Sequence, residues 1–415
     1  MDGVNKERLF IASCFALLVT SLTFGIRAGI MNELGVAFEL NETELGWMTM
    51  MAFLGFPVAT MVGGALYNSV GPRLLMWFAF GCHLLGLGLT IAATGFELLL
   101  ISTFFVGFAN GMVEAACNPL IADMYPDEKT TMLNRFHVWF PGGIAIGALV
   151  SKFMGEAGLS WQPQVGFILI PTIIYGAMIV GQTFPKSENI ESDTQKNFRS
   201  MLDWLFILTA VCITLTATTE LGTQQWIEKL VGAASGADPA YVLALVTGIM
   251  AVGRFFAGPL VHSLNPIGVL FASAIVTTVG IVMMSQVTGG LVYVAAILFA
   301  VGVCYFWPTI IGFTAEYMPD TGALGMSIMG GIGMFGLSIW QPIIGGWLDA
   351  AKKEAGWAKD LPAEELAQIE LLAGQQTLDN IAFFPAILIV LFGFLYVQRK
   401  HLEKRVENGE LIIDN

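Results

Sequence analysis

The chain has 415 residues, of which 55% are hydrophobic and only 12% are charged. Soluble globular domains carry roughly 25% charged residues, so this composition is typical of a chain whose surroundings are mostly lipid. The formal net charge of −13 argues against a nucleic-acid partner.

Twelve apolar runs follow one another along the chain, and a helix needs roughly 20 such residues to cross a bilayer. The runs lie at 9–34, 45–69, 74–95, 98–124, 134–155, 164–184, 201–224, 238–262, 267–286, 289–315, 322–349 and 377–398. This pattern predicts an all-α membrane protein with twelve transmembrane helices in two pseudo-symmetric six-helix bundles. The N-terminal bundle would span 1–184, a cytoplasmic linker 185–200 and the C-terminal bundle 201–415.

Lysine and arginine indicate the orientation, because cytoplasmic loops of membrane proteins are enriched in them. With both termini inside, the inner segments hold twelve of the nineteen and the outer segments hold five. We therefore expect both termini in the cytoplasm and the protein in the plasma (inner) membrane. The first run lacks a clear cleavage site, so we expect it to be retained as a helix. The segment 350–376 is then external, and its AEELAQIELL pattern favours a short surface helix.

Charged side chains at bilayer depth cost at least ~2.5–3.5 kcal/mol each, so they are rare and usually functional. Arg27, in the first run, is interpreted either as a substrate contact or as the partner of a glutamate. Glu114, in the fourth run, is interpreted as a proton carrier, or else as a structural partner of an arginine. Asn110 and Asn118 lie four residues to either side of Glu114, so the three side chains share a helix face that should line a cavity. His137, at the start of the fifth run, is either a packing residue or a proton relay.

The seventh run ends in ELGTQQW, at 220–226. Glu220 and Gln224 share a helix face, and Gln225 and Trp226 follow. Side-chain amides can pair with sugar hydroxyls, and an indole ring can cover the apolar face of a pyranose. The alternative is an interfacial tryptophan with polar neighbours. Arg254, in the eighth run, would form a gating or capping ion pair, reach the interface, or contact substrate.

Trp307, Trp340 and Gln341 could line the C-terminal side of a pocket. The chain contains no phosphate-binding loop, no metal-ligand spacing and no nucleophile–base arrangement. Nothing therefore favours an enzyme, a metal site or a cofactor.

The two halves also contain similar segments, GALYNSVGPRLL at 64–75 and GPLVHSLNPIGV at 258–269. Six-span repeats related by an axis along the membrane normal place a substrate site near the midplane, between the halves. Twelve runs, a central linker and the Gly-x-Leu-x-x-x-x-Gly-x-Arg loop ending at Arg73 resemble the major facilitator superfamily. Asn68 stands where that family usually has an aspartate. The resemblance implies a coupling or gating role for the loop.

Three further sets of residues resemble the fucose–proton symporter group. They are Glu114-x-x-x-Asn118-Pro119 with Leu133-Asn134, Glu220 with Trp226, and Gly253-Arg254. The resemblance implies that Glu114 is linked to both proton and sugar. Fucose members also use an aspartate in the first helix, where this chain has Ala28 beside Arg27.

We therefore predict a secondary active transporter that imports a monosaccharide-like solute with a proton by alternating access, and we expect a monomer. Sodium could replace the proton as the coupling ion. Uptake of a sugar acid or another organic anion is a close alternative, because Arg27 occupies the usual acidic region. An exporter of drugs or metabolites is a second class. A sensor or scaffold is disfavoured by the short soluble segments.

Overall fold

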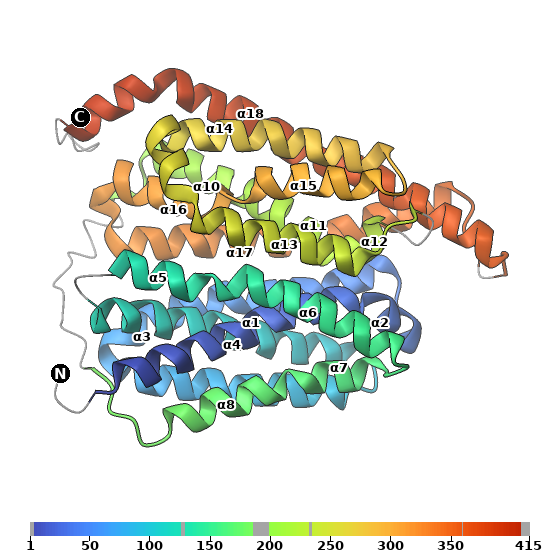
Figure 1. The fold of residues 1–415 in the computed structure, drawn as a ribbon, viewed down its shortest axis with the longest axis horizontal. Helices are drawn as coiled ribbons and strands as arrows, with labels where there is room; N and C mark the ends of the chain where they lie inside the picture. The colour runs from blue at the N-terminus through green and yellow to red at the C-terminus, as the bar shows by residue number, and fades with distance from the viewer. Residues whose placement is uncertain (1–3, 126–128, 186–198, 232–234, 359, 408–415) are drawn as a thin grey trace.

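The computed structural model describes residues 4–125, 129–185, 199–231, 235–358 and 360–407 (Figure 1). These residues are helical along nearly their whole length, and the described part of the chain contains no β-strand. The prediction of an all-α membrane protein is confirmed.

Two helices in the first half of the chain begin with side-chain caps. Asn5 accepts a hydrogen bond from the Arg8 backbone N–H at 3.0 Å, and Asn41 and Glu44 form a capping box. Such caps satisfy N–H groups that have no partner inside the helix. The helices of this half are α1 (Lys6–Gly29), α2 (Met31–Phe38), α3 (Glu42–Ile91), α4 (Phe96–Met124), α5 (Lys129–His137), α6 (Trp139–Glu156), α7 (Trp161–Phe167) and α8 (Leu169–Ile179).

The second half starts in the same way, with Asp203 and Asp238 as N-cap residues of two of its helices. One segment, η1, is a π-helical turn, and another, η3, is a 3₁₀ turn. The elements are α10 (Trp204–Ala217), η1 (Thr218–Gly222), α11 (Thr223–Gln225), α12 (Ile227–Val231), α13 (Pro239–Phe255), α14 (Ala257–Gln286), α15 (Leu291–Val303), α16 (Phe306–Tyr317), η3 (Pro319–Thr321), α17 (Gly322–Glu354) and α18 (Ala363–Glu407).

The described residues contain eleven helical segments that are long and apolar enough to cross a membrane. The eighth predicted run corresponds to a shorter apolar helix, Pro239–Arg254, which continues through a break at Phe256 into α14. With this helix included, the fold has the twelve membrane helices that the sequence predicts.

The sequence repeat has a counterpart in the backbone. The long helix α3 breaks at Gly71, where φ is +77°, and α14 breaks at Asn265, where φ is +55°. Both residues stand at the same position of the repeated segment, and a proline follows each. Glycine and asparagine tolerate positive φ better than other residues, so each half bends its chain at the equivalent point.

The two halves form two layers of helices. Figure 1 shows α1–α8 in one layer and α10–α18 in the other, with α3 and α6 packed against α17 and α13 across the boundary. The start of α1 and the end of α18 lie at the same end of the molecule.

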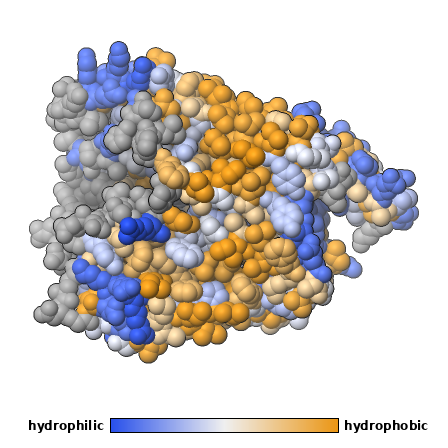
Figure 2. All heavy atoms as spheres, in the orientation of Figure 1, coloured by the Kyte–Doolittle hydropathy of each residue, from blue (hydrophilic) through white to orange (hydrophobic). Residues whose placement is uncertain are grey.

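The outer surface is apolar around its middle. Figure 2 shows hydrophobic residues over the central part of this face and hydrophilic residues gathered toward both ends. Large apolar side chains such as Phe78, Val390 and Val397 are exposed, with 57%, 70% and 79% of their surface accessible. In water such exposure would be unfavourable, whereas in a bilayer these side chains face lipid.

The predicted short surface helix within 350–376 differs from the observed structure. The segment after Glu354 turns, and Ala363 then begins a single 45-residue helix that continues to Glu407. The residues of the AEELAQIELL pattern are therefore the first turns of the last membrane helix. The last membrane helix therefore begins before the apolar run that the sequence places at 377–398.

Candidate functional site

The two halves are joined by ion pairs at the end of the molecule away from the chain termini. The Glu42 carboxylate, at the start of α3, accepts hydrogen bonds from Lys229 of α12 at 3.0 Å and from Lys352 of α17 at 2.6 Å. Lys152 of α6 pairs with Asp238 at the start of α13. Each pair links one half to the other, so the interface is closed at this end.

The backbone takes part in the same closure. Asp349, near the end of α17, accepts hydrogen bonds from the N–H groups of Glu42 at 3.1 Å and Thr43 at 2.9 Å. It thereby satisfies N–H groups that the start of α3 would otherwise leave unpaired. Gly345, one turn earlier on α17, brings the two helices so close that a side chain there would overlap the Glu42 carbonyl oxygen.

Glu114 lies in a polar cluster within the N-terminal half. Asn118, one turn further along α4, donates its amide N–H to Glu114 Oε2 at 2.7 Å. His137, at the end of α5, places Nε2 3.1 Å from Asn118 Oδ1 and 3.9 Å from Glu114 Oε2. The Glu114 side chain is 12% exposed and that of His137 is 42% exposed.

The bonding pattern of this cluster assigns its hydrogens. Because the Asn118 amide nitrogen donates to Glu114, its carbonyl oxygen faces His137, and His137 Nε2 must carry a hydrogen. No lysine or arginine forms an ion pair with Glu114 among the residues that the structure describes. The carboxylate is therefore held by the Asn118 amide, and the more exposed imidazole of His137 lies beside it.

Glu220 is held differently, in the C-terminal half. It lies in the π turn η1, and its Oε1 is 2.9 Å from Arg254 Nη2. Arg254 also donates from Nε to the Cys304 carbonyl oxygen at 3.0 Å. The Glu220 side chain is 5% exposed and that of Arg254 is 20% exposed. This carboxylate is therefore neutralised by a fixed cation, within a type of turn that often occurs at functional sites.

Arg27 lies near the end of α1, with 6% of its surface exposed. Its guanidinium carbon is 5.1 Å from the ring centre of Phe24 and 5.3 Å from that of Phe53. Nε donates to Gln225 Oε1 of the other half at 2.9 Å, while Nη2 is buried without a hydrogen-bond partner. No ion pair within the described ranges includes Arg27, so it does not neutralise Glu114 in this conformation.

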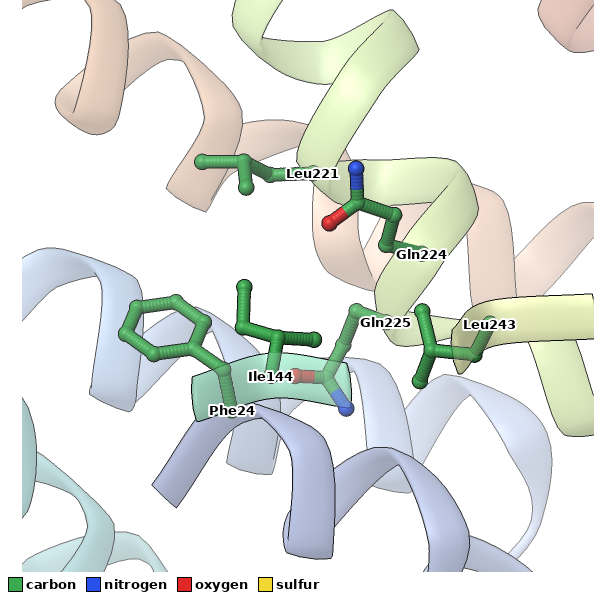
Figure 3. A pocket seen from close by; sticks show the side chains of 6 residues that line it. All are labelled: Phe24, Ile144, Leu221, Gln224, Gln225 and Leu243. Carbon is green, nitrogen blue, oxygen red and sulfur yellow. The ribbon is translucent and has the colours of Figure 1, made fainter. Parts of the chain in front are cut away.

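A small pocket lies next to Arg27, between the halves. Figure 3 shows Gln224 and Gln225 extending from one half, with Phe24 and Ile144 facing them from the other. Gln224 Nε2 lies 3.3 Å from Met250 Sδ, whereas Gln224 Oε1 and Gln225 Nε2 are buried without hydrogen-bond partners. Leu221 and Leu243 complete the lining. The pocket therefore combines apolar walls with polar atoms that are free to bind a ligand.

The aromatic residues singled out in the sequence are not among the residues that line this pocket. Trp226 is fully buried, and its indole N–H donates to Gln341 Oε1 at 3.0 Å. Trp340 packs against Trp347 and Phe384, with ring centres 5.9 and 4.7 Å away. Trp307 lies against α17. In this conformation the indole N–H of Trp226 and the amide oxygen of Gln341 are therefore hydrogen-bonded to each other.

Asn110 shares its helix face with Glu114 but joins a separate network. Its amide oxygen is 2.9 Å from His83 Nε2, and its amide nitrogen donates to Thr23 Oγ1 at 3.0 Å. His83 Nδ1 is in turn 2.9 Å from the Tyr175 hydroxyl. Asn110 and His83 are buried, so this chain ties four membrane segments together inside the N-terminal half. Sequence reasoning missed His83, although a histidine within an apolar run was a visible signal.

The loop motif after the second membrane helix contributes an exposed arginine, Arg73. The side chain of Asn68 lies outside the described part of the structure. The ion pairs of Glu42 also escaped sequence reasoning, because nothing in its NETELG context indicates which lysines it meets.

The two bundles, the closure at one end and the polar groups along their boundary define a helical membrane transporter. The chain belongs to the Major Facilitator Superfamily, whose family model matches residues 9–341. The protein is therefore a transporter and not an enzyme.

Comparison with known proteins agrees with this family. Solute carrier family 2, facilitated glucose transporter member 10 of Danio rerio is 26% identical over 165 residues, which cover 39% of this chain and 32% of that protein. The chain spans about a third of the length of the first curated relatives that it matches.

Two solved structures illustrate the fold. A bacterial homologue of the human lysosomal transporter Spinster, inward-facing and unoccupied, aligns with a TM-score of 0.75 and 13% identity, over 93% of this chain and 96% of that chain. The E. coli fucose:proton symporter aligns with a TM-score of 0.60 and 16% identity, over 93% and 98%. The predicted resemblance to the superfamily is confirmed, and at these identities the structural likeness shows the fold alone.

Proposed function

We propose that the protein is a secondary active transporter that imports a monosaccharide-like solute together with a proton, by alternating access. Sugar transporters among its relatives support the solute class, and the proton-coupled symporter of similar fold supports the coupling. The observation that carries the proposal is the environment of Glu114.

The two membrane carboxylates differ in what neutralises them. Glu220 is 2.9 Å from the guanidinium of Arg254, which supplies a permanent counter-charge. Glu114 instead bonds an amide, with His137 as its only ion-pair partner among the described residues. A carboxylate in a low-dielectric site without a permanent cation can take up and release a proton as its exposure changes. Glu114 is therefore the proton carrier.

The other residues have supporting roles. His137 would exchange the proton with water, because it is the most exposed member of the cluster. Gln224 and Gln225 would bind solute hydroxyls, and Trp226 with Gln341 would hold their helix in place. The pair of Glu220 and Arg254 would fix the π turn that precedes these glutamines.

The closed end of the molecule suggests the conformational state. The distribution of lysine and arginine favours both termini in the cytoplasm, in the inner or plasma membrane. The ion pairs of Glu42 and Lys152 then close the outer end. The structure would be inward-facing, with His137 near the cytoplasmic opening.

The test is proton movement in proteoliposomes, followed with a pH-sensitive dye outside the vesicles. A panel of neutral sugars and sugar acids is added to the wild type and to Glu114→Gln. We expect substrate to raise the external pH with the wild type. Glu114→Gln should abolish this signal while retaining exchange of labelled substrate, because the amide cannot carry a proton.

Glu97→Gln is the matched control. Glu97 lies in the first turn of the same helix and is exposed, so its loss should leave the proton signal unchanged. Uptake that needs sodium and gives no pH change would move the coupling to another ion. Equal proton movement with Glu114→Gln would show that Glu114 is not the carrier.

A further inference from the structure

The buried guanidinium of Arg27 has no anion to neutralise it. It is enclosed by the rings of Phe24 and Phe53, and its hydrogen-bond partner is a neutral amide, that of Gln225. Two aromatic faces and an amide offset only part of the cost of removing such a charge from water. Arg254 of the same protein, by contrast, has an anionic partner, Glu220.

Unpaired polar atoms belong to Arg27, to its hydrogen-bond partner Gln225 and to the neighbouring Gln224. Arg27 Nη2 and Gln225 Nε2 are buried donors without acceptors, and Gln224 Oε1 is a buried acceptor without a donor. Gln224 and Gln225 line the pocket of Figure 3, and Phe24, under the guanidinium, lines it from the other half. Buried polar groups of native proteins are nearly always satisfied, so two unpaired amide atoms on the pocket lining, with an unpaired guanidinium N–H on the residue that bonds Gln225, suit a polar ligand at this position.

The identity of these atoms restricts the ligand. Two donors, one of them cationic, match the two oxygens of a carboxylate, and a guanidinium binds carboxylates with a geometry that an ammonium lacks. The neighbouring acceptor, Gln224 Oε1, requires a donor such as a hydroxyl group. A neutral sugar would supply the hydroxyl but would leave the charge of Arg27 uncompensated.

We propose that Arg27, Gln224 and Gln225 form a subsite for the carboxylate and an adjacent hydroxyl of the solute, so that the transported monosaccharide-like compound is a sugar acid. This inference rests on the proposed transport function and specifies the substrate class of that site. Because Arg27 and Gln225 belong to different halves, the bound carboxylate would contact both when the outer end closes. The solute would thus favour the closure that carries it across.

The test compares matched pairs of solutes in proteoliposomes: glucose with glucuronate and with gluconate, and galactose with galacturonate. Each is measured as labelled uptake and as protection of the detergent-solubilised protein against thermal unfolding. We expect the acids to be transported and to stabilise the wild type, with little effect of the parent sugars. Arg27→Gln should weaken acid binding by about 10- to 100-fold, and Arg27→Lys should restore part of it.

Lys353→Gln is the charge-matched control, since Lys353 is an exposed cation at the end of α17 and should leave the acid preference unchanged. If Arg27→Gln does not fold, the thermal stabilisation of the wild type by the acids and by the neutral sugars still decides whether the site prefers a carboxylate. Transport and stabilisation by neutral sugars, with none by the acids, would overturn the carboxylate subsite and leave the transport proposal intact. So would an Arg27→Gln variant that keeps the acid preference. Failure of every solute in the panel to be transported or to stabilise the protein would overturn both proposals.

Discussion

A single methyl group at Gly345 should oppose closure at the end of the transporter that the ion pairs of Glu42 and Lys152 join. An alanine Cβ at this position would overlap the carbonyl oxygen of Glu42 on the other half, far closer than two such atoms approach in proteins. The obstructing atom belongs to the backbone of α3, so it cannot rotate away as a side chain could. The closed conformation can therefore accommodate Gly345→Ala only if α3 and α17 separate.

The size of the effect follows from the cost of overpacking, which is typically about 1–3 kcal/mol. Because the overlap exists only while the helices are in contact, this cost falls on the closed state alone. It should shift the equilibrium toward a state in which this end is open by about 5- to 150-fold. Transport by alternating access should slow, because this end must close in every cycle.

The assay is a distance measurement between spin labels on two exposed positions, Val36 of α2 and Lys353 of α17. The native cysteines are buried, which favours selective labelling of the introduced pair. We expect the wild type to show mainly the short distance and Gly345→Ala to gain a longer one.

Gly346→Ala is the control, because the nearest atom to its added methyl group is Thr43 Oγ1 at an ordinary 3.8 Å. Both substitutions raise helix propensity equally, so the difference between them isolates the overlap. Identical distance distributions for the two variants would refute the reasoning.

Two further predictions concern buried polar groups. Burial raises the pKa of Glu228, beside Lys229 and Glu33 at the closed end, to about 7. Opening of this end would return the pKa of Glu228 to its ordinary, lower value. The raised pKa therefore stabilises the closed state most at a pH below that ordinary value, and this stabilisation is lost as the pH rises through about 7. The same spin-label distances measured between pH 5 and 8 test this, and a pH response that persists in Glu228→Gln would contradict it. His83→Phe should lower the stability by about 1–3 kcal/mol, because the Asn110 amide oxygen loses its buried partner. Thermal unfolding measures this loss, and an unchanged midpoint would argue against a role for the network in stability.

The sequence determined the architecture because the bilayer imposes a length on every apolar segment. Twelve runs, their division into two sets of six and the repeated loop segment were sufficient to predict two similar bundles. The positive φ angles at Gly71 and Asn265 follow from residue types that tolerate this conformation, at equivalent positions of the repeat. The spacing of Glu114 and Asn118 also indicated a shared helix face, since four residues make about one turn.

The pairing of the charges was decided by tertiary structure alone. The sequence placed Arg27, Glu114, Glu220 and Arg254 at bilayer depth, but periodicity gives only the face of a helix and not what that face meets. Arg254 lies 34 residues from Glu220 and bonds it, whereas Arg27 reaches across 198 residues to the amide of Gln225.

Asn110 shows the same limit within one helix. Its spacing from Glu114 predicted a common face toward a cavity, yet its amide bonds His83 and Thr23 inside the bundle. A helix face is wide enough to meet two different neighbours, and only the packing of α4 against α1 and α3 selects between them. The sequence thus determines which polar groups enter the membrane, while the packing of the two halves decides which remain available to a proton or a solute.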